Sequence, residues 1–165
     1  KGNRFKRETY FKVYLTNPSL RAALFEPLPA DDPALGHLVE TGVLSHWFHS
    51  KVAKNMRYAR WKEGRRYREV DLVILDSKTQ KTNFAIEVKW CERALERPKE
   101  LADLKRFAEL NNLDDPMATT RTQWSSLEHD GTKINLHPCS ISTFTSSQII
   151  TRESDDPLAG RPFPL

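Results

Sequence analysis

The 165-residue sequence has only two cysteines, Cys91 and Cys139. Two cysteines are too few for a disulfide framework and match no zinc-binding spacing, which favours a reducing compartment. No apolar run approaches the roughly 20 residues of a transmembrane helix, and no charged-then-apolar leader opens the chain. We therefore expect a cytoplasmic protein that has no contact with a membrane.

Several catalytic motifs are also missing from the sequence. It contains neither a Gly-X-X-X-X-Gly-Lys phosphate-binding loop nor a Gly-X-Ser-X-Gly nucleophile elbow. The chain is thus not expected to hydrolyse nucleotides itself or to be a serine hydrolase. With 38% hydrophobic residues, it has enough apolar material for one core. We expect a single domain over residues 1–165, with flexible tails at 1–9 and 146–165.

Positive charge is concentrated in two segments. The net charge of the chain is only +4, but residues 51–68 hold eight basic residues against Glu63 alone, a net charge of +7. Residues 1–12 carry a further +4, and the remainder of the chain is acidic. This distribution is typical of a protein with one side facing a polyanion. The candidate phosphate contacts are Arg57, Arg60, Lys62, Arg65, Arg66 and Arg68, which are interleaved with aromatic residues. The alternative is a solvated hairpin.

The hydrophobic pattern predicts an α/β sandwich with a mixed sheet. We expect strands at 10–15, 56–61, 69–76, 83–90, 119–124 and 134–144. We expect helices at 19–25, from the capping pair Asp31 and Asp32 with Pro33 to about Ala53, and from Pro98 to about 111–112. The 76–82 segment should close a hairpin between the two most apolar strands.

Charged side chains interrupt those two strands. Strict alternation along a strand places Asp71 on the face of Val73 and Leu75, and Glu87 on the same face as Lys89. Unpaired charges in a sheet covered by helices would cost several kcal/mol each. The long helix also carries Glu40 at the edge of its apolar stripe or on it.

These charges form a chemically coherent set. Two carboxylates brought together by the hairpin, Asp71 and Glu87, repel each other unless a cation lies between them. Oxygen ligands without His or Cys favour Mg²⁺ or Mn²⁺. Lys89 could orient or deprotonate a water, or stabilise charge on a phosphate. Glu40 could hold a metal-bound water in the outer shell of the metal, and Glu69 is a reserve candidate for a metal ligand. The pattern indicates metal-assisted phosphodiester hydrolysis. The alternative for the strands is a solvated face with cross-strand ion pairs, and for Glu40 a salt bridge on the helix surface.

The order of these residues resembles the PD-(D/E)XK nuclease superfamily, whose signature is a helix Glu, a strand Asp and a Glu-X-Lys on the next strand. Here they are Glu40, Asp71 and Glu87-Val88-Lys89. Segments 12–21, 36–40, 69–71 and 86–89 also look like the C-terminal domain that follows many prokaryotic AAA+ ATPase domains. That resemblance covers roughly residues 10–145. The departures, at Ser19, Val39 and Thr41, remove no charged signature residue.

The resemblance implies a restriction-endonuclease-like mixed β-sheet flanked by helices. It further implies a Mg²⁺-dependent DNA endonuclease with Asp71 and Glu87 as metal ligands, associated with an AAA+ ATPase domain in the same or another chain. The alternative is a non-catalytic DNA-binding or protein-interaction module with the same fold. In a third interpretation the domain is purely structural and binds neither metal nor nucleic acid.

Overall fold

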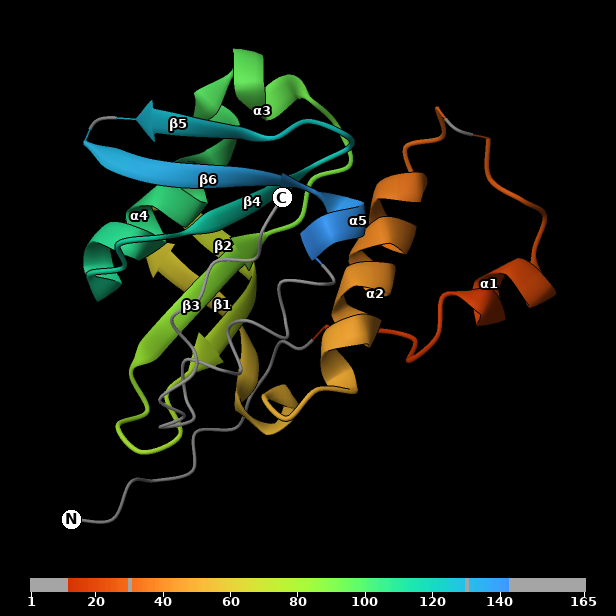
Figure 1. Cartoon of the computed structure of the whole chain (residues 1–165), viewed down its shortest axis with the longest axis horizontal. Helices are drawn as coiled ribbons and strands as arrows, with labels where there is room; N and C mark the ends of the chain where they lie inside the picture. Colours follow the sequence, from red (N-terminus) through yellow and green to blue (C-terminus); the bar gives the residue numbers. More distant parts are fainter. Residues whose placement is uncertain (1–11, 30, 130, 143–165) are drawn as a thin grey trace, which may run out of the picture.

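The computed structural model describes residues 12–29, 31–129 and 131–142 (Figure 1). The strands are β1 (Met56–Glu63), β2 (Arg66–Leu75), β3 (Thr82–Glu87), β4 (Met117–Thr120), β5 (Ser125–His129) and β6 (Thr132–Pro138). The helices are α1 (Ser19–Leu24), α2 (Leu35–Phe48), α3 (Arg93–Glu96), α4 (Ala102–Asn111) and α5 (Cys139–Ser142), with short 3₁₀ turns at Ala53–Asn55 and Pro98–Leu101.

The strands of the described residues form one six-stranded mixed sheet in the order β1-β2-β3-β4-β6-β5. Strands β1, β2 and β3 form an antiparallel meander, β3–β4 and β4–β6 pair in parallel, and β5 and β6 form an antiparallel hairpin. The parallel β3–β4 pair requires a crossover, which α3 and α4 supply. The expected α/β class with a mixed sheet and flanking helices is therefore confirmed.

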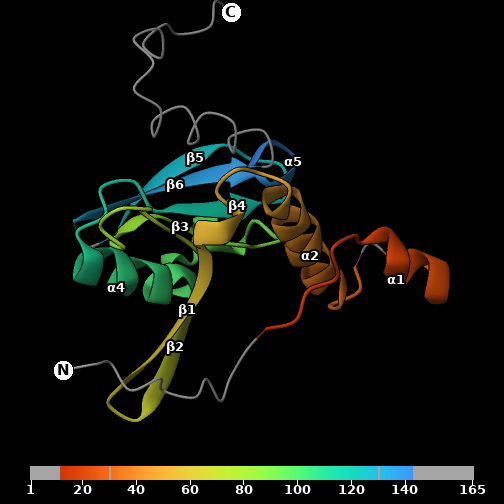
Figure 2. The same ribbon diagram turned by 90° about the horizontal axis from the view of Figure 1, so that it is seen from below.

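Each face of the sheet packs against a different helix (Figure 2). On one face, Leu44 and Trp47 of α2 pack with Leu72, Ile74 and Ile86. On the other, α4 supplies Leu104, Phe107 and Ala108 to a second cluster that includes Val70, Val73 and Ala85. Burying both faces explains why the central strands are nearly continuous apolar runs.

A bulge in the second half of β2, between Val70 and Val73, changes which residues share a face. Arg57 pairs with Val73 and Ala59 with Val70, so one strand advances by two residues while the other advances by three. Such an extra residue breaks the alternation of side chains. Val73 and Leu75 pack toward α4, whereas Asp71 contacts Lys12 on the α2 side. The expectation that Asp71 shares a face with Val73 and Leu75 is therefore wrong.

The N-terminal strand expected at 10–15 is not formed by its described residues. Residues 12–15 have no regular secondary structure and pair with no described strand. Their side chains nevertheless alternate, because Val13 and Leu15 are exposed while Lys12 and Tyr14 are half-buried. The segment therefore has strand-like alternation without a neighbouring strand. Residues 10, 11, 143 and 144 and the expected tails at 1–9 and 146–165 lie outside the described residues.

Several element boundaries differ from the expected ones. Helix α2 begins at Leu35 and ends at Phe48 rather than near Ala53. Asp32 accepts a hydrogen bond from the Ala34 amide at 2.8 Å, in the turn before the helix. The strand expected at 134–144 is confirmed as far as residue 138, but residues 139–142 form α5 instead. The preceding residues 125–129 form β5, which pairs with β6 in a hairpin whose turn contains Gly131 (φ 78°). None of the described helices is both long and apolar enough to span a bilayer.

Candidate active site

A hollow of about 530 Å³ lies beside the end of β3 and the first turns of α2. Its lining contains all four residues predicted to carry the chemistry, which are Glu40, Asp71, Glu87 and Lys89. They come from α2, from β2, and from the end of β3 with the residues directly after it. Residues separated by up to 49 positions in the sequence are thus gathered around one solvent-accessible space.

Asp71 is held in place by the backbone of the neighbouring strand. Its Oδ2 accepts a hydrogen bond from the Val88 amide at 2.9 Å. The bulge turns Asp71 toward α2, and this bond fixes one carboxylate oxygen. Its other oxygen, Oδ1, faces the Lys12 ammonium at 2.8 Å. Both carboxylate oxygens of Asp71 are therefore restrained by hydrogen bonds.

Glu87 is a buried carboxyl whose pKa is raised by its surroundings. Its side chain is 14% exposed, and Oε1 accepts a hydrogen bond from Lys89 Nζ at 2.8 Å. Its Oε2 is buried and has no hydrogen-bond partner among the described residues. Burial, together with the negative charge of Asp71, raises the pKa of Glu87 to about 7. One oxygen of Glu87 therefore has no described partner, and a nearby positive charge would stabilise the ionised form of the carboxyl.

Lys89 is positioned through its backbone by β4. Its amide donates to Thr119 Oγ1 at 2.7 Å, and the same hydroxyl donates to the Lys89 carbonyl at 2.8 Å. Burial lowers the pKa of Lys89, but the adjacent Glu87 and Asp71 carboxylates outweigh it, so that the pKa is raised overall. The Lys89 side chain is therefore an ammonium at neutral pH, which favours charge stabilisation over the role of a general base.

Lys12 lies inside the acidic cluster rather than on an outer basic surface. Its ammonium contacts Glu40 Oε1 at 3.2 Å, Asp71 Oδ1 at 2.8 Å and the carboxylate of Glu69. Burial lowers the pKa of Lys12, but these carboxylates raise it well above the usual range overall. The charge of Lys12, which the sequence places among the basic residues of segment 1–12, is thus shared by three carboxylates.

Glu40 is connected to the strand carboxylates through the N-terminal segment. Its Oε1 accepts hydrogen bonds from the Tyr14 hydroxyl and from Lys12. Burial and the contact with Glu40 raise the pKa of Tyr14, so the phenol stays protonated and remains a donor. Lys12 therefore links Glu40 to Asp71, and the outer-shell role of Glu40 stays a prediction.

The residues present fit a divalent cation that is held mainly by two carboxylates. The described residues contain no group of three or more His, Cys, Asp or Glu arranged to hold a metal ion. Mg²⁺, however, is usually bound through one or two carboxylates, with water and substrate phosphate completing its shell. The unpartnered Oε2 of Glu87 and the fixed Asp71 supply such a pair.

The predicted basic segment is divided between the two sides of the β1–β2 hairpin. Arg66 and Arg68 contact Asp103 of α4 at 3.3 and 2.8 Å, and Arg68 also pairs with Glu63 at 2.5 Å. Arg60 instead lies over the Tyr67 ring at 4.5 Å. Lys62 reaches the same ring at 5.9 Å, and Arg65 is exposed at the turn. Only part of the segment therefore faces the side where the carboxylates lie.

Three residues that shape the site were not identified from the sequence. Lys12 and Tyr14 belong to a segment that the sequence predicts as a strand. Their spacing of two residues, which places both side chains on one face of a strand, was the available signal. Thr119 gave no signal, because a threonine in a short apolar strand is ordinary.

A scan against protein-family models and a search of curated proteins find no match to the chain.

Proposed function

We propose that the chain is a metal-dependent nuclease-like domain that hydrolyses DNA phosphodiester bonds with Mg²⁺ or Mn²⁺. The observation that carries the proposal is the Asp71, Glu87 and Lys89 arrangement. Glu87 presents a buried, unpartnered oxygen close enough to Asp71 for their charges to interact, and Lys89 lies 2.8 Å from the other oxygen of Glu87. A restriction-endonuclease-like fold remains part of this proposal.

The roles of the side chains follow from their contacts. Asp71 and Glu87 are the proposed metal ligands, and a bound Mg²⁺ supplies positive charge at the phosphate and lowers the pKa of water. Lys89 keeps its proton and neutralises the negative charge that develops on a phosphate oxygen. Glu40, held by Tyr14, accepts hydrogen bonds from water at the outer edge of the site.

Charge complementarity supports DNA as the substrate. A site rich in carboxylates repels a phosphate backbone unless cations offset it. The nearby cations are Lys12 and Lys89 within the hollow and Arg57 and Arg60 along β1. In the proposed setting an AAA+ ATPase domain, in this or another chain, supplies the nucleotide hydrolysis for which this sequence has no phosphate-binding loop.

A second candidate function is a non-catalytic DNA-binding module. The contact of Lys12 with Glu40, Glu69 and Asp71 favours it, because an internal ammonium balances acidic charge without a metal. In that case the carboxylates stabilise the fold and the basic residues bind DNA. The two functions differ in their dependence on metal.

The test is cleavage of plasmid DNA by the purified chain with Mn²⁺ or Mg²⁺. The proposal predicts nicking that is abolished by EDTA and reduced at least about 100-fold in Asp71→Asn and in Lys89→Met. The control is Glu128→Gln, which changes an exposed carboxylate on β5 and should leave the rate unchanged. Equal nicking by all variants would identify a contaminating nuclease. DNA binding without cleavage would support the non-catalytic module.

A further inference from the structure

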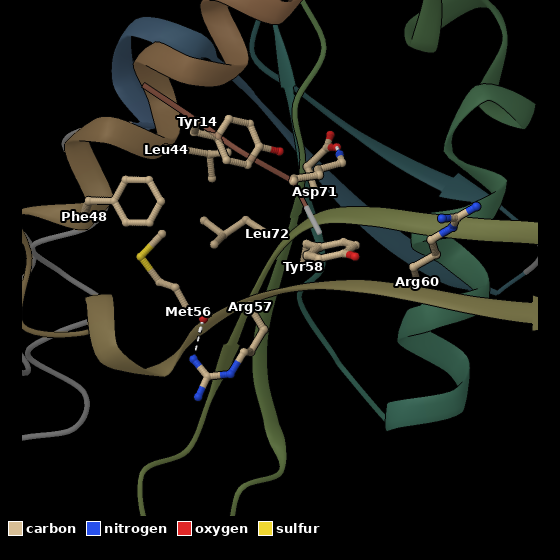
Figure 3. Close-up of a pocket in the computed structure, with 10 residues that line it drawn as sticks. Tyr14, Leu44, Phe48, Met56, Arg57, Tyr58, Arg60, Asp71 and Leu72 are labelled. Carbon is tan, nitrogen blue, oxygen red and sulfur yellow. Dashed lines mark hydrogen bonds and ion pairs between the residues drawn. The ribbon is translucent and has the colours of Figure 1, made fainter. Parts of the chain in front are cut away.

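A second hollow, of about 420 Å³, lies between the end of α2 and strand β1 (Figure 3). Its floor is apolar, since Leu44 and Leu72 are each 2% exposed and Met56 is 8% exposed. Three aromatic rings line it, Tyr14 from the N-terminal segment, Phe48 from the last turn of α2 and Tyr58 from β1. The volume falls within the range of about 300–1,000 Å³ that is typical of small-ligand sites.

This aromatic hollow adjoins the first hollow, which contains Glu40, Asp71, Glu87 and Lys89. Lys12 and Asp71 line both of them. Figure 3 shows Tyr58 close to Asp71, with Phe48 and Met56 across the space between α2 and β1. A ligand with a phosphate at Asp71 can therefore extend along the protein surface into the aromatic hollow.

The rim of the aromatic hollow is cationic. The guanidinium of Arg57 donates to the carbonyls of Met56 at 2.6 Å and Lys54 at 2.9 Å, which holds it at the edge. Arg60 lies farther along β1 and stacks over Tyr67 at 4.5 Å. An apolar, aromatic interior with cations at its edge matches the two parts of a nucleotide, a flat base and a phosphate.

We infer that this hollow receives one unpaired base of a DNA strand whose adjacent phosphate lies at Asp71. The inference rests on the proposed nuclease function and specifies its substrate. A base inside a duplex is stacked and paired, and it reaches a pocket only after being extruded at a cost of a few kcal/mol. The domain should therefore prefer single-stranded or frayed DNA over an intact duplex.

Charge distinguishes this occupant from an uncharged apolar ligand. The apolar interior would accept a DNA base or an uncharged aromatic ligand. The Arg57 and Arg60 guanidinium groups, however, form no ion pair with a ligand that lacks an anion. Removal of Arg60 should therefore weaken binding of the strand, whereas it would leave an uncharged ligand unaffected. Removal of Tyr58 should weaken binding about 5-fold to 150-fold, because base stacking is lost.

The experiment measures binding without cleavage, with the metal removed by EDTA. Fluorescence anisotropy with a labelled 12-nucleotide single strand is compared with the same sequence as a blunt duplex. Phe48→Ala and Tyr58→Ala should each weaken single-strand binding about 5-fold to 150-fold and change duplex binding less than twofold. Leu110→Ala, an exposed apolar residue on α4, is the matched control and should change neither.

Two further measurements keep the inference falsifiable. If an alanine variant does not fold, Phe48→Leu and Tyr58→Leu keep apolar bulk without a ring and should still weaken single-strand binding. A strand of abasic sites, which keeps the phosphates, should bind the unmodified protein as weakly as the normal strand binds Tyr58→Ala. Equal binding of normal and abasic strands, or of single strand and duplex, overturns the inference even if DNA is cleaved. Base-dependent binding without cleavage removes the nuclease proposal and leaves the base pocket.

Discussion

Lys12 Nζ lies 2.8 Å from Asp71 Oδ1, so an ammonium from the N-terminal part of the described chain contacts a proposed metal ligand. The same ammonium lies 3.2 Å from Glu40 Oε1 and also contacts Glu69. Three carboxylates from α2 and β2 thus share one positive charge. Removing that charge leaves partly desolvated carboxylates that repel one another.

Lys12→Gln should therefore destabilise the metal-free protein by about 1–3 kcal/mol. Mn²⁺ should restore part of the loss, because a divalent cation replaces the missing positive charge. Urea unfolding with EDTA and with Mn²⁺ measures both effects. Lys133→Gln, an exposed lysine on β6, is the control and should behave like the unmodified protein. Unfolding curves that coincide for Lys12→Gln and the unmodified chain would show that the contact contributes nothing.

The raised pKa of Glu87 predicts a specific pH dependence of stability. The carboxyl is protonated in both folded and unfolded protein below pH 4.5, and its folded pKa is about 7. Its contribution is therefore fully present below pH 4.5 and is lost as the pH rises through 7. In EDTA, the stability of the unmodified protein relative to Glu87→Gln should fall by on the order of 3 kcal/mol across this window. A difference that stays constant with pH would mean that Glu87 is not desolvated.

Lys89 should act on the reaction without being a metal ligand. In Lys89→Met the ammonium is lost and an unbranched apolar side chain is kept, so nicking should fall at least about 100-fold while Mn²⁺ still binds. Plasmid nicking and calorimetry with the same preparation separate the two effects. Loss of Mn²⁺ binding together with nicking would place Lys89 in the structure of the site rather than in the chemical step.

The two sides of the β1–β2 hairpin should respond differently to removal of their arginines. The pair Arg57→Ala and Arg60→Ala should weaken DNA binding and reduce the slope of log K against log salt by about 1 for each residue. The pair Arg66→Ala and Arg68→Ala removes contacts to Asp103 and should mainly lower stability. DNA binding at several salt concentrations and thermal unfolding are the measurements. Equal salt slopes in both pairs would contradict this division of roles.

Much of the central sheet could be predicted from the sequence. Its strands are apolar, β-branched runs separated by polar turns, and local patterns of this kind identify strands well. The helix that carries Glu40 and the strands that carry Asp71 and Glu87 were identified for this reason. Because both strands belong to one hairpin, the approach of Asp71 to Glu87 also follows from local sequence.

The parts that could not be predicted depend on contacts between distant residues. The bulge beside Asp71 arises from the register between β1 and β2, which residue pattern alone does not specify. Lys12 and Glu40 are 28 residues apart, and their contact requires the chain to return along α2. A lysine among basic neighbours indicates an outward-facing charge, and only the tertiary fold shows that it contacts carboxylates.

The most direct test of the proposed metal centre is a calorimetric titration of the chain with Mn²⁺, compared with Asp71→Asn. This substitution keeps the size of the side chain and removes the charge of one proposed ligand. We predict saturable binding of Mn²⁺ by the unmodified protein and none by Asp71→Asn, with Glu128→Gln binding normally. Absence of binding by the unmodified protein, or equal binding by Asp71→Asn, would contradict the proposal that Asp71 and Glu87 form a metal centre.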